Sequence, residues 1–324
     1  MVEYRVSVDD SECEHLWRQV WPENCLFDLW PVRHCFAEAY DSTPYFIVAE
    51  DQYRILGLLA LSKIADNDCY GFYPAETWQQ KTWIEQNRIP AATPEVLRGL
   101  LEAVPEKTHL RYISTSMTST IDFPLMVDEV NYQFFPGRVN YSFETYMQLF
   151  SGKSRKQILK ETDSLKALGA SYQFDNFADI DYLFQVNQAS YGESSYFADS
   201  RFLNAFTLLS AWLRDNGMLK ITTLRLGGKI AAVDLGALWN NKYTLLAGCT
   251  DPEFPGVAKL INLHHMETAC HRKMASVDFL CGDFNWKRRF RLTESPLYQM
   301  NVMPSRYGQY LLNQPHVKSA ASGY

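Results

Sequence analysis

The first candidate for chemistry is the segment from Thr250 to Gly256, together with the residues after it. Two prolines and a glycine precede an apolar pattern of helical spacing, which predicts a loop that leads into a helix. A helix N-terminus has free N–H groups and a partial positive charge, and both favour a bound phosphate. Because Gly256 has no side chain, it would leave access to the N–H groups of Val257, Ala258 and Lys259. The same residues are also typical of a Pro-Gly turn that simply starts a helix.

Asp234 is a candidate general base. It lies in the stretch from Ile230 to Trp239, which is apolar on both faces and predicts a buried strand. Burial disfavours the charged form of a carboxylate, so we expect a raised pKa for Asp234, as a proton acceptor near neutral pH requires. A structural partner such as Arg225 is an equally good interpretation.

Three polar side chains of the predicted helix share one arc with apolar residues: His264, Glu267 and His271. We therefore expect all three to be partly buried. Such a set could hold a metal ion, but no fourth ligand is visible. Because buried polar groups must pair, a hydrogen-bonded set inside the fold is the better interpretation, and we predict no metal.

A basic tract opens the second half of the chain, with Lys153, Arg155, Lys156 and Lys160. Most such helical faces are simply solvated. Gly152-Lys153-Ser154 resembles the end of a phosphate-binding loop, but Met147 stands where its first glycine belongs, which argues against an NTPase. The chain also lacks a Ser-His-Asp order, a Gly-x-Ser-x-Gly elbow and a Rossmann fingerprint.

The elements that would position these residues are clearest in the second half. Apolar spacing predicts helices at 153–168, 175–191 and about 202–216, and strands at 171–174, 218–226, 229–239, 242–249 and 276–281. Gly227-Gly228 and Asn240-Asn241 are strong two-residue hairpin signals between three of these strands. This order predicts a mixed α/β layer in which the strand before the long helix that starts at Gly256 and the strand after it pair in parallel.

The first half repeats this order less clearly. It predicts a strand at 3–8, two helices within 10–40, a meander across 45–73 with a turn at Asn67-Asp68, helices across 76–104 and a strand at 109–114. At roughly 100–200 residues per domain, a chain of 324 residues favours two domains. We therefore predict two copies of one α/β unit, over residues 1–145 and 146–324.

Composition limits the class of protein. The chain is 47% hydrophobic and 21% charged, which excludes disorder for its bulk. The longest mostly apolar stretch, 55–61, is too short to span a membrane, and the N-terminus lacks the features of a signal peptide. Seven scattered cysteines without a Cys-x-x-Cys pair predict reduced thiols and a cytoplasmic protein.

The charge is unevenly distributed. Residues 1–145 hold 11 Lys+Arg against 22 Asp+Glu, and residues 146–324 hold 20 against 15, so balances of −11 and +5 give the net −6. We expect anionic ligands, if any, at the second half. A strongly basic nucleic-acid-binding domain would usually have a larger excess of positive charge, and we predict no binding of DNA.

Three segments resemble the tandem-GNAT acyltransferases of the FemAB-like group, which includes acyltransferases linked to cellulose biosynthesis. They are the basic helix from Lys153 to Lys160, the run from Cys249 to Gly256, and the stretch from Asp278 to Phe290 with its Gly-Asp…aromatic-Lys order. The resemblance covers about residues 150–295, and it extends to the first half through the order of elements. It implies two GNAT-like (acyl-CoA N-acyltransferase) units in tandem, with the donor site in the second.

The resemblance implies transfer of an acyl group from acyl-CoA to a small-molecule or peptide amine by direct attack. The thioester would lie along the strand at 242–249, where the N–H groups near Ala247 and Gly248 polarise its carbonyl. The diphosphate would lie on the N–H groups that follow Gly256. Arg155 or Lys156 would contact a phosphate-bearing substrate.

The resemblance also assigns roles after the last core strand. Lys287 would hold an anionic group of the acceptor or stabilise the oxyanion, and Asp283 would orient Lys287. The sequence departs from the common GNAT pattern here, because Trp286 and Lys287 occupy the neighbourhood of the usual acidic tyrosine. It departs again in the phosphate arm, which has Glu253 and a single glycine.

The first unit departs further. Its stretch from Tyr73 to Trp78 lacks a glycine at the helix start, and Glu76 would repel a diphosphate. This unit is therefore expected to act as a scaffold or acceptor wall. Two alternatives stay open: an aminoacyl-tRNA-dependent peptidyltransferase of FemAB type, for which tRNA would be a partner, and a non-catalytic binding protein.

Overall fold

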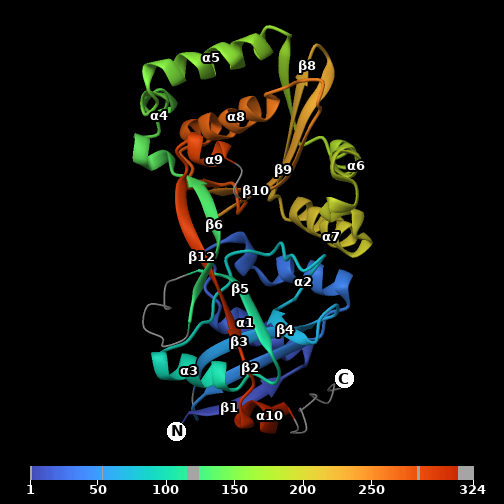
Figure 1. Ribbon diagram of the computed structural model, residues 1–324, viewed down its shortest axis with the longest axis vertical. Helices are drawn as coiled ribbons and strands as arrows, with labels where there is room; N and C mark the ends of the chain where they lie inside the picture. Colours follow the sequence, from blue (N-terminus) through green and yellow to red (C-terminus); the bar gives the residue numbers. More distant parts are fainter. Residues whose placement is uncertain (1, 53, 115–123, 283–284, 313–324) are drawn as a thin grey trace. The chain divides into compact units, whose positions relative to one another are not determined.

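The computed structural model describes residues 2–52, 54–114, 124–282 and 285–312, and its elements are labelled in Figure 1. The chain divides into two compact units. Unit 1 comprises Met1–Val130, Arg201–Leu209 and Pro296–Tyr324, and unit 2 comprises Asn131–Ser200 and Ser210–Ser295. Each unit contains one mixed sheet with helices on both faces.

The sheet of unit 1 has the order β1-β2-β3-β4-β5-β12, with β4 and β5 parallel and the other neighbours antiparallel. Its strands are β1 (Glu3–Ser7), β2 (Pro44–Glu50), β3 (Ile55–Ile64), β4 (Cys69–Phe72), β5 (Thr108–Ile113) and β12 (Thr293–Val302). Its helices are α1 (Asp10–Val20), the 3-10 helix η1 (Leu26–Asp28), α2 (Trp30–Tyr40), α3 (Pro94–Glu102) and α10 (Arg306–Leu312).

The central strands of unit 1 are buried on both faces, which explains why β2 and β3 have long apolar runs. Ile47 of β2 packs in a core with Leu97 and Leu100 of α3. Phe46, the neighbour of Ile47, points to the opposite face and packs with Trp17 of α1. Thus α1 and α2 cover one face of this sheet, and α3 covers the other.

The sheet of unit 2 has the order β6-β11-β10-β9-β8-β7, with β10 and β11 parallel and the other neighbours antiparallel. Its strands are β6 (Met126–Phe134), β7 (Ala170–Phe174), β8 (Leu219–Leu226), β9 (Lys229–Trp239), β10 (Lys242–Thr250) and β11 (Ser276–Asp278). The helices are η3 (Pro136–Val139), α4 (Phe143–Gln148), α5 (Gly152–Lys166), α6 (Asp179–Tyr191), η4 (Gly192–Ser194), η5 (Tyr196–Ala198), α8 (Val257–His271) and α9 (Trp286–Arg289). Helix α7 (Ser200–Asp215) is divided, because Arg201–Leu209 belong to unit 1 and its other residues to unit 2.

Helices α6 and α8 lie on opposite faces of the sheet of unit 2 (Figure 1). Thr223 of β8 donates a hydrogen bond of 2.5 Å to Asp179 of α6. Leu224, the next residue, points the other way and packs with Val257 and Leu260 of α8. Because successive strand side chains point to opposite faces, these two contacts fix the side of each helix.

The two units repeat one topology, with β1 to β5 of unit 1 matching β7 to β11 of unit 2. The repeat differs from a simple tandem in its sixth strand. β6 follows β5 in the chain but pairs with β11 in unit 2, through Val277 opposite Phe134. β12 follows unit 2 in the chain but pairs with β5 in unit 1, through Tyr298 opposite Ile113. Each sheet is therefore completed by a strand from the other half of the sequence.

Most predicted elements are present, including the hairpin turns at Gly227-Gly228 and Asn240-Asn241, where all four residues have positive φ. Of the helices expected across 76–104, only α3 is present. Glu76 accepts hydrogen bonds from residues 82 to 84, and these bonds hold the segment before α3 as a loop. The helix expected from 175 begins at Asp179, since Asp175 has a φ of 53°. No described helix is both long and apolar enough to cross a membrane.

Candidate functional site

In unit 2, the parallel strands β10 and β11 run together for three residues and then diverge. Their register pairs end at Thr244 opposite Asp278, where β11 stops. The chain then turns toward β6, and Phe279 N donates to Tyr132 O at 2.9 Å. β10 continues to Thr250 alongside β9, with a shift of register between Leu245 and Ala247. The strand is thus left without its parallel neighbour over the residues that the sequence analysis assigns to the thioester.

The predicted thioester residues Ala247 and Gly248 lie directly after this irregularity. Ala247 is half-buried and Gly248 is exposed, although both belong to an inner strand of the sheet. An exposed glycine at a β-bulge allows another molecule to approach the backbone closely. The geometry therefore makes the main chain of these two residues accessible.

Asp234 of β9 lies opposite Gly248 and is buried. Its Oδ2 is 2.8 Å from Nε2 of His265, a buried residue of α8. A Cβ on Gly248 would lie 2.3 Å from Asp234 Oδ1, so the carboxylate requires a glycine here. Arg225, the partner considered from the sequence, instead donates to Gln173 Oε1 and Gly228 O. The structural partner of Asp234 is His265, which the sequence analysis missed.

The ring of Tyr243 stacks on His265, with centroids 4.9 Å apart. Gly236 gives it room, because a Cβ there would lie 2.5 Å from the tyrosine ring. The Asp234–His265 pair is therefore enclosed between β9, β10 and α8. In the sequence, His265 could be identified only as a residue on the buried side of α8. Its contact with Asp234 could not be predicted, because it depends on how α8 lies over the sheet.

Helix α8 begins as predicted at Gly256, which has a φ of 86° and open space where a Cβ would be. The positive φ favours glycine, whereas the open space would leave room for a ligand. Two of the three expected donors are used inside the turn: Val257 N donates to Phe254 O at 3.1 Å, and Lys259 N donates to Gly256 O at 3.0 Å. Ala258 N has no such partner among the described residues, which leaves it as the donor available to a ligand.

Charged side chains surround the start of α8. Lys259 forms an ion pair with Glu161 of α5, and burial together with nearby Arg289 lowers its pKa. Glu253 is paired with Lys229 at 2.8 Å, so its charge is offset. The candidate phosphate contacts Arg155 and Lys156 lie in the first two turns of α5, the former half-buried and the latter exposed.

Lys287 is buried, with 3% of its surface exposed. Its Nζ donates to three successive carbonyl oxygens, of Phe279 (2.8 Å), Leu280 (2.8 Å) and Cys281 (2.6 Å). An ammonium group has three protons, so these bonds occupy all of them. The structure thus shows Lys287 holding the turn after β11 through the backbone of that turn. Asp283 lies outside the described residues.

Asp278, at the end of β11, holds the same turn from the other side. Its carboxylate accepts hydrogen bonds from Asn131 Nδ2 (2.8 Å), Gln133 Nε2 (2.9 Å) and Leu280 N (2.9 Å). Leu280 has a φ of 56°, a left-handed conformation that an L-residue keeps only when its surroundings enforce it. Asp278 belongs to the segment that resembles the FemAB-like group, but its role could not be predicted from the sequence.

The candidate set on α8 does not form. His264 stacks on Tyr172 with centroids 4.0 Å apart, and burial lowers its pKa to about 4. Glu267 and His271 are exposed, contrary to the expectation of shared burial. Over the described part of the chain, no three His, Cys, Asp or Glu side chains gather as metal ligands would.

The chain resembles known proteins in part of its sequence and in its fold. Residues 152–288 match the family described as an acetyltransferase (GNAT) domain. A search of curated proteins finds no match. Solved structures with a similar fold include FemX (TM-score 0.58, 9% identity, 96% of this chain and 100% of that one). L-PGS from Bacillus licheniformis is also similar (TM-score 0.55, 10% identity, 94% and 96%).

A tandem GNAT protein from the clavulanic acid biosynthesis pathway has a TM-score of 0.52 at 9% identity, with 94% of this chain and 100% of that chain covered. At such identities the structural likeness is one of fold. It confirms the predicted mixed α/β architecture of GNAT type. The match of residues 152–288 to the acetyltransferase family bears out the prediction of an acyltransferase.

Proposed function

We propose that unit 2 transfers an acyl group from acyl-CoA to an amine acceptor by direct attack. The observation that carries this proposal is the divergence of β10 from β11 beside an exposed glycine, Gly248. It leaves a length of strand open to an extended donor, which can pair with the main chain as a missing strand would. The chain then reaches Gly256 and the start of α8 within one turn-rich loop.

The thioester carbonyl lies near Ala247 and Gly248 in this proposal. Backbone N–H groups directed at a developing oxyanion lower the barrier to attack, because they are already oriented before the reaction. The bulge between Leu245 and Ala247 supports this placement, since it turns main-chain groups out of the regular ladder. The donor diphosphate lies at Ala258 N, near the positive end of the helix.

The acceptor amine must lose a proton before it attacks. Asp234 and His265 are 5% and 6% exposed, so an amine does not reach them directly. We assign them a positioning role, in which the Asp234 carboxylate is held by His265 and packs against Gly248. Ordered water then takes the proton of the amine. In the same way, Asp278 and Lys287 position the turn that follows β11. This replaces the direct roles that the sequence analysis gave to Asp234 and Lys287.

The acyl-CoA donor is tested by isothermal titration calorimetry of the whole chain with acetyl-CoA, longer acyl-CoAs and aminoacyl-tRNA, at low and high salt. We expect binding of acyl-CoA with a shallow dependence on salt. A tRNA donor would contact many phosphates, and each neutralised phosphate steepens the dependence. Tight, strongly salt-dependent binding of tRNA alone would favour a peptidyltransferase, and binding of neither would favour a non-catalytic protein.

The acceptor is proposed to be a small-molecule or peptide amine, and the reaction is placed in the cytoplasm, where thiols stay reduced. All seven cysteines are free in the structure, and burial raises the pKa of Cys13 and Cys249 to about 12. A thiol with so high a pKa is a poor nucleophile. This supports direct attack without an acyl-cysteine intermediate at either residue.

A further inference from the structure

Unit 1 contains a cavity of about 160 Å³ that the proposed donor chemistry does not use. It lies where the parallel strands β4 and β5 separate after one register pair, Tyr70 opposite Thr108. Gly71 of β4 lines one side, and His109 and Arg111 of β5 line the other. An apolar cavity of about 150 Å³ holds a benzene-sized molecule, so this cavity has room for a small ligand.

Glu76 brings an acidic group to the cavity. Its side chain is buried, and Oε1 accepts hydrogen bonds from Thr82 Oγ1, Trp83 N (2.9 Å) and Ile84 N (2.7 Å). Glu76 lines the cavity, and no hydrogen bond from a described residue reaches its other oxygen, Oε2. Burial raises the pKa of this carboxyl group, although the hydrogen bonds and Arg33 favour its charged form. Oε2 is thus an acceptor to which no described residue donates a hydrogen bond, in a side chain that is 3% exposed.

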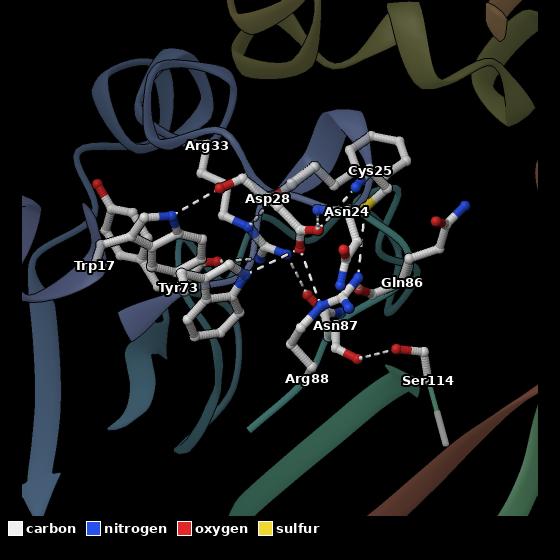
Figure 2. Close-up of polar contacts among 12 residues, drawn as sticks. Trp17, Asn24, Cys25, Asp28, Arg33, Tyr73, Gln86, Asn87, Arg88 and Ser114 are labelled. Carbon is white, nitrogen blue, oxygen red and sulfur yellow. Dashed lines mark hydrogen bonds and ion pairs between the residues drawn. The ribbon is translucent and has the colours of Figure 1, made fainter. Parts of the chain in front are cut away.

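Arg33 and Asn87 form a rigid part of the wall, shown in Figure 2. Arg33 donates from Nε to Phe27 O, from Nη1 to Tyr73 O and from Nη2 to Asn87 Oδ1, each at 2.7 Å. Asn87 in turn donates to Arg111 O at 3.0 Å. Because every partner here is backbone or a fixed amide, the wall is held in one arrangement before a ligand arrives.

The charges behind this wall are balanced. Burial lowers the pKa of Arg33 to about 10, so its guanidinium stays charged at neutral pH. Arg88 is paired with the buried Asp28 at 3.0 Å, and Asp28 also accepts from Asn24 N and Cys25 N (Figure 2). Arg33 and Arg88 are thus matched by Asp28 and Glu76, and a bare anion would be repelled at Oε2.

The β5 side of the cavity offers donors. Arg111 is fixed by Asp128 through Nε (3.0 Å) and Nη2 (2.7 Å). Among the described residues its Nη1 has no hydrogen-bond partner, which leaves two N–H groups for a ligand. His109 is oriented by a contact of 3.0 Å between its Nε2 and Gln299 Oε1.

From this arrangement we infer that the cavity binds a small zwitterion of the amino-acid class, with its ammonium on Glu76 Oε2 and its carboxylate at Arg111 Nη1. An ammonium group supplies the donors that Oε2 lacks, and a carboxylate matches a guanidinium edge. An apolar ligand would leave Oε2 buried without a partner, at a cost in affinity. The site lies within unit 1, so its binding can be measured without the acyl donor.

The test is calorimetric titration of the whole chain with the standard L-amino acids at neutral pH, in the absence of acyl-CoA. We expect at least one to bind. Its N-acetyl derivative, which has no ammonium group, should bind about 100-fold more weakly, and its amide about 10-fold more weakly. If no amino acid binds at millimolar concentration, or the N-acetyl derivative binds equally well, the inference is wrong.

Variants locate the site. Glu76→Gln keeps an oxygen acceptor for residues 82 to 84 but removes the charge, and we expect it to reduce affinity about 100-fold. Glu38→Gln removes an exposed carboxylate on α2 and is the matched control, with unchanged affinity. Gly256→Glu should also bind the amino acid normally, which separates this site from the donor site. A folded Glu76→Gln protein with full affinity contradicts the inference, and if that variant does not fold, the comparison of ligands on the parent chain decides.

Discussion

Asp234 Oδ2 lies 2.8 Å from His265 Nε2, and the other oxygen of that carboxylate occupies the space that a side chain on Gly248 would need. One carboxylate thus connects β9, β10 and α8. The contacts of this carboxylate explain how β10 stays packed in the sheet although Gly248, at its bulge, is exposed. It also gives each of the three residues a distinct, measurable role.

Gly248→Ala should destabilise unit 2 by about 1–3 kcal/mol, because the new Cβ would overlap Asp234 Oδ1. Urea unfolding measures the change. Gly152→Ala is the control, because a Cβ there meets nothing within 4 Å and no loss is expected. In an Asp234→Ala background the cost of Gly248→Ala should shrink, since the obstacle is gone. Equal cost in both backgrounds would show that the two residues do not compete for space.

Lys287→Met should lower the free energy of unfolding by about 1–3 kcal/mol, because three carbonyl oxygens lose a shared donor. Arg288→Met, on the neighbouring exposed residue, is the matched control and should change stability little. A positioning role also predicts weaker donor binding in calorimetry, as the turn after β11 relaxes. If Lys287→Met is fully stable and raises only the KM of the acceptor, Lys287 instead binds the acceptor directly.

Two substitutions at Gly256 separate the effect of backbone conformation on acyl-CoA binding from the effect of charge. Gly256→Ala imposes a side chain at a φ of 86° but adds no charge, so it reports the backbone strain. Gly256→Glu adds a negative charge at the proposed diphosphate site and should weaken acyl-CoA binding about tenfold more than Gly256→Ala does. Calorimetry with acetyl-CoA compares the three proteins. Equal affinities for the two variants would place the diphosphate elsewhere.

His264 predicts a pH dependence of stability. Burial lowers its pKa to about 4, with His265 and Arg272 acting in the same direction. In the unfolded chain His264 takes up a proton near pH 6.5, and in the folded chain only near pH 4. The stability that neutral His264 contributes is therefore fully present above about pH 6.5 and is lost as the pH falls toward 4. His264→Phe keeps an aromatic ring on Tyr172 and should gain stability relative to the parent as the pH falls through this window.

Urea unfolding at a series of pH values measures that difference. His271→Gln alters an exposed histidine of the same helix and should follow the parent chain. A constant difference between His264→Phe and the parent from pH 7 to pH 4 would contradict the lowered pKa.

The order of elements could be predicted because its signals are local. The Gly-Gly and Asn-Asn turns, the apolar runs of β8 to β10 and the Pro-Gly start of α8 each depend on neighbouring residues. The sixth strands could not be predicted, because β6 and β12 find their partners far along the chain. The same holds for His265, whose contact with Asp234 depends on how α8 lies over the sheet, and for Glu76, whose loop is organised by its own carboxylate.

The exchange of sixth strands has a consequence for how the protein is made. A ribosome releases the chain from its N-terminus, and most domains fold as soon as their residues have emerged. Unit 1 cannot follow that order, because the strand that pairs with β5 ends at Val302 of 324 residues. Until then the edge of β5 is an unpaired strand of the kind that promotes aggregation. Nascent unit 1 therefore waits until β12 has been synthesised, and a stop codon just before Thr293 would leave its sheet without β12 although none of its first 130 residues had changed.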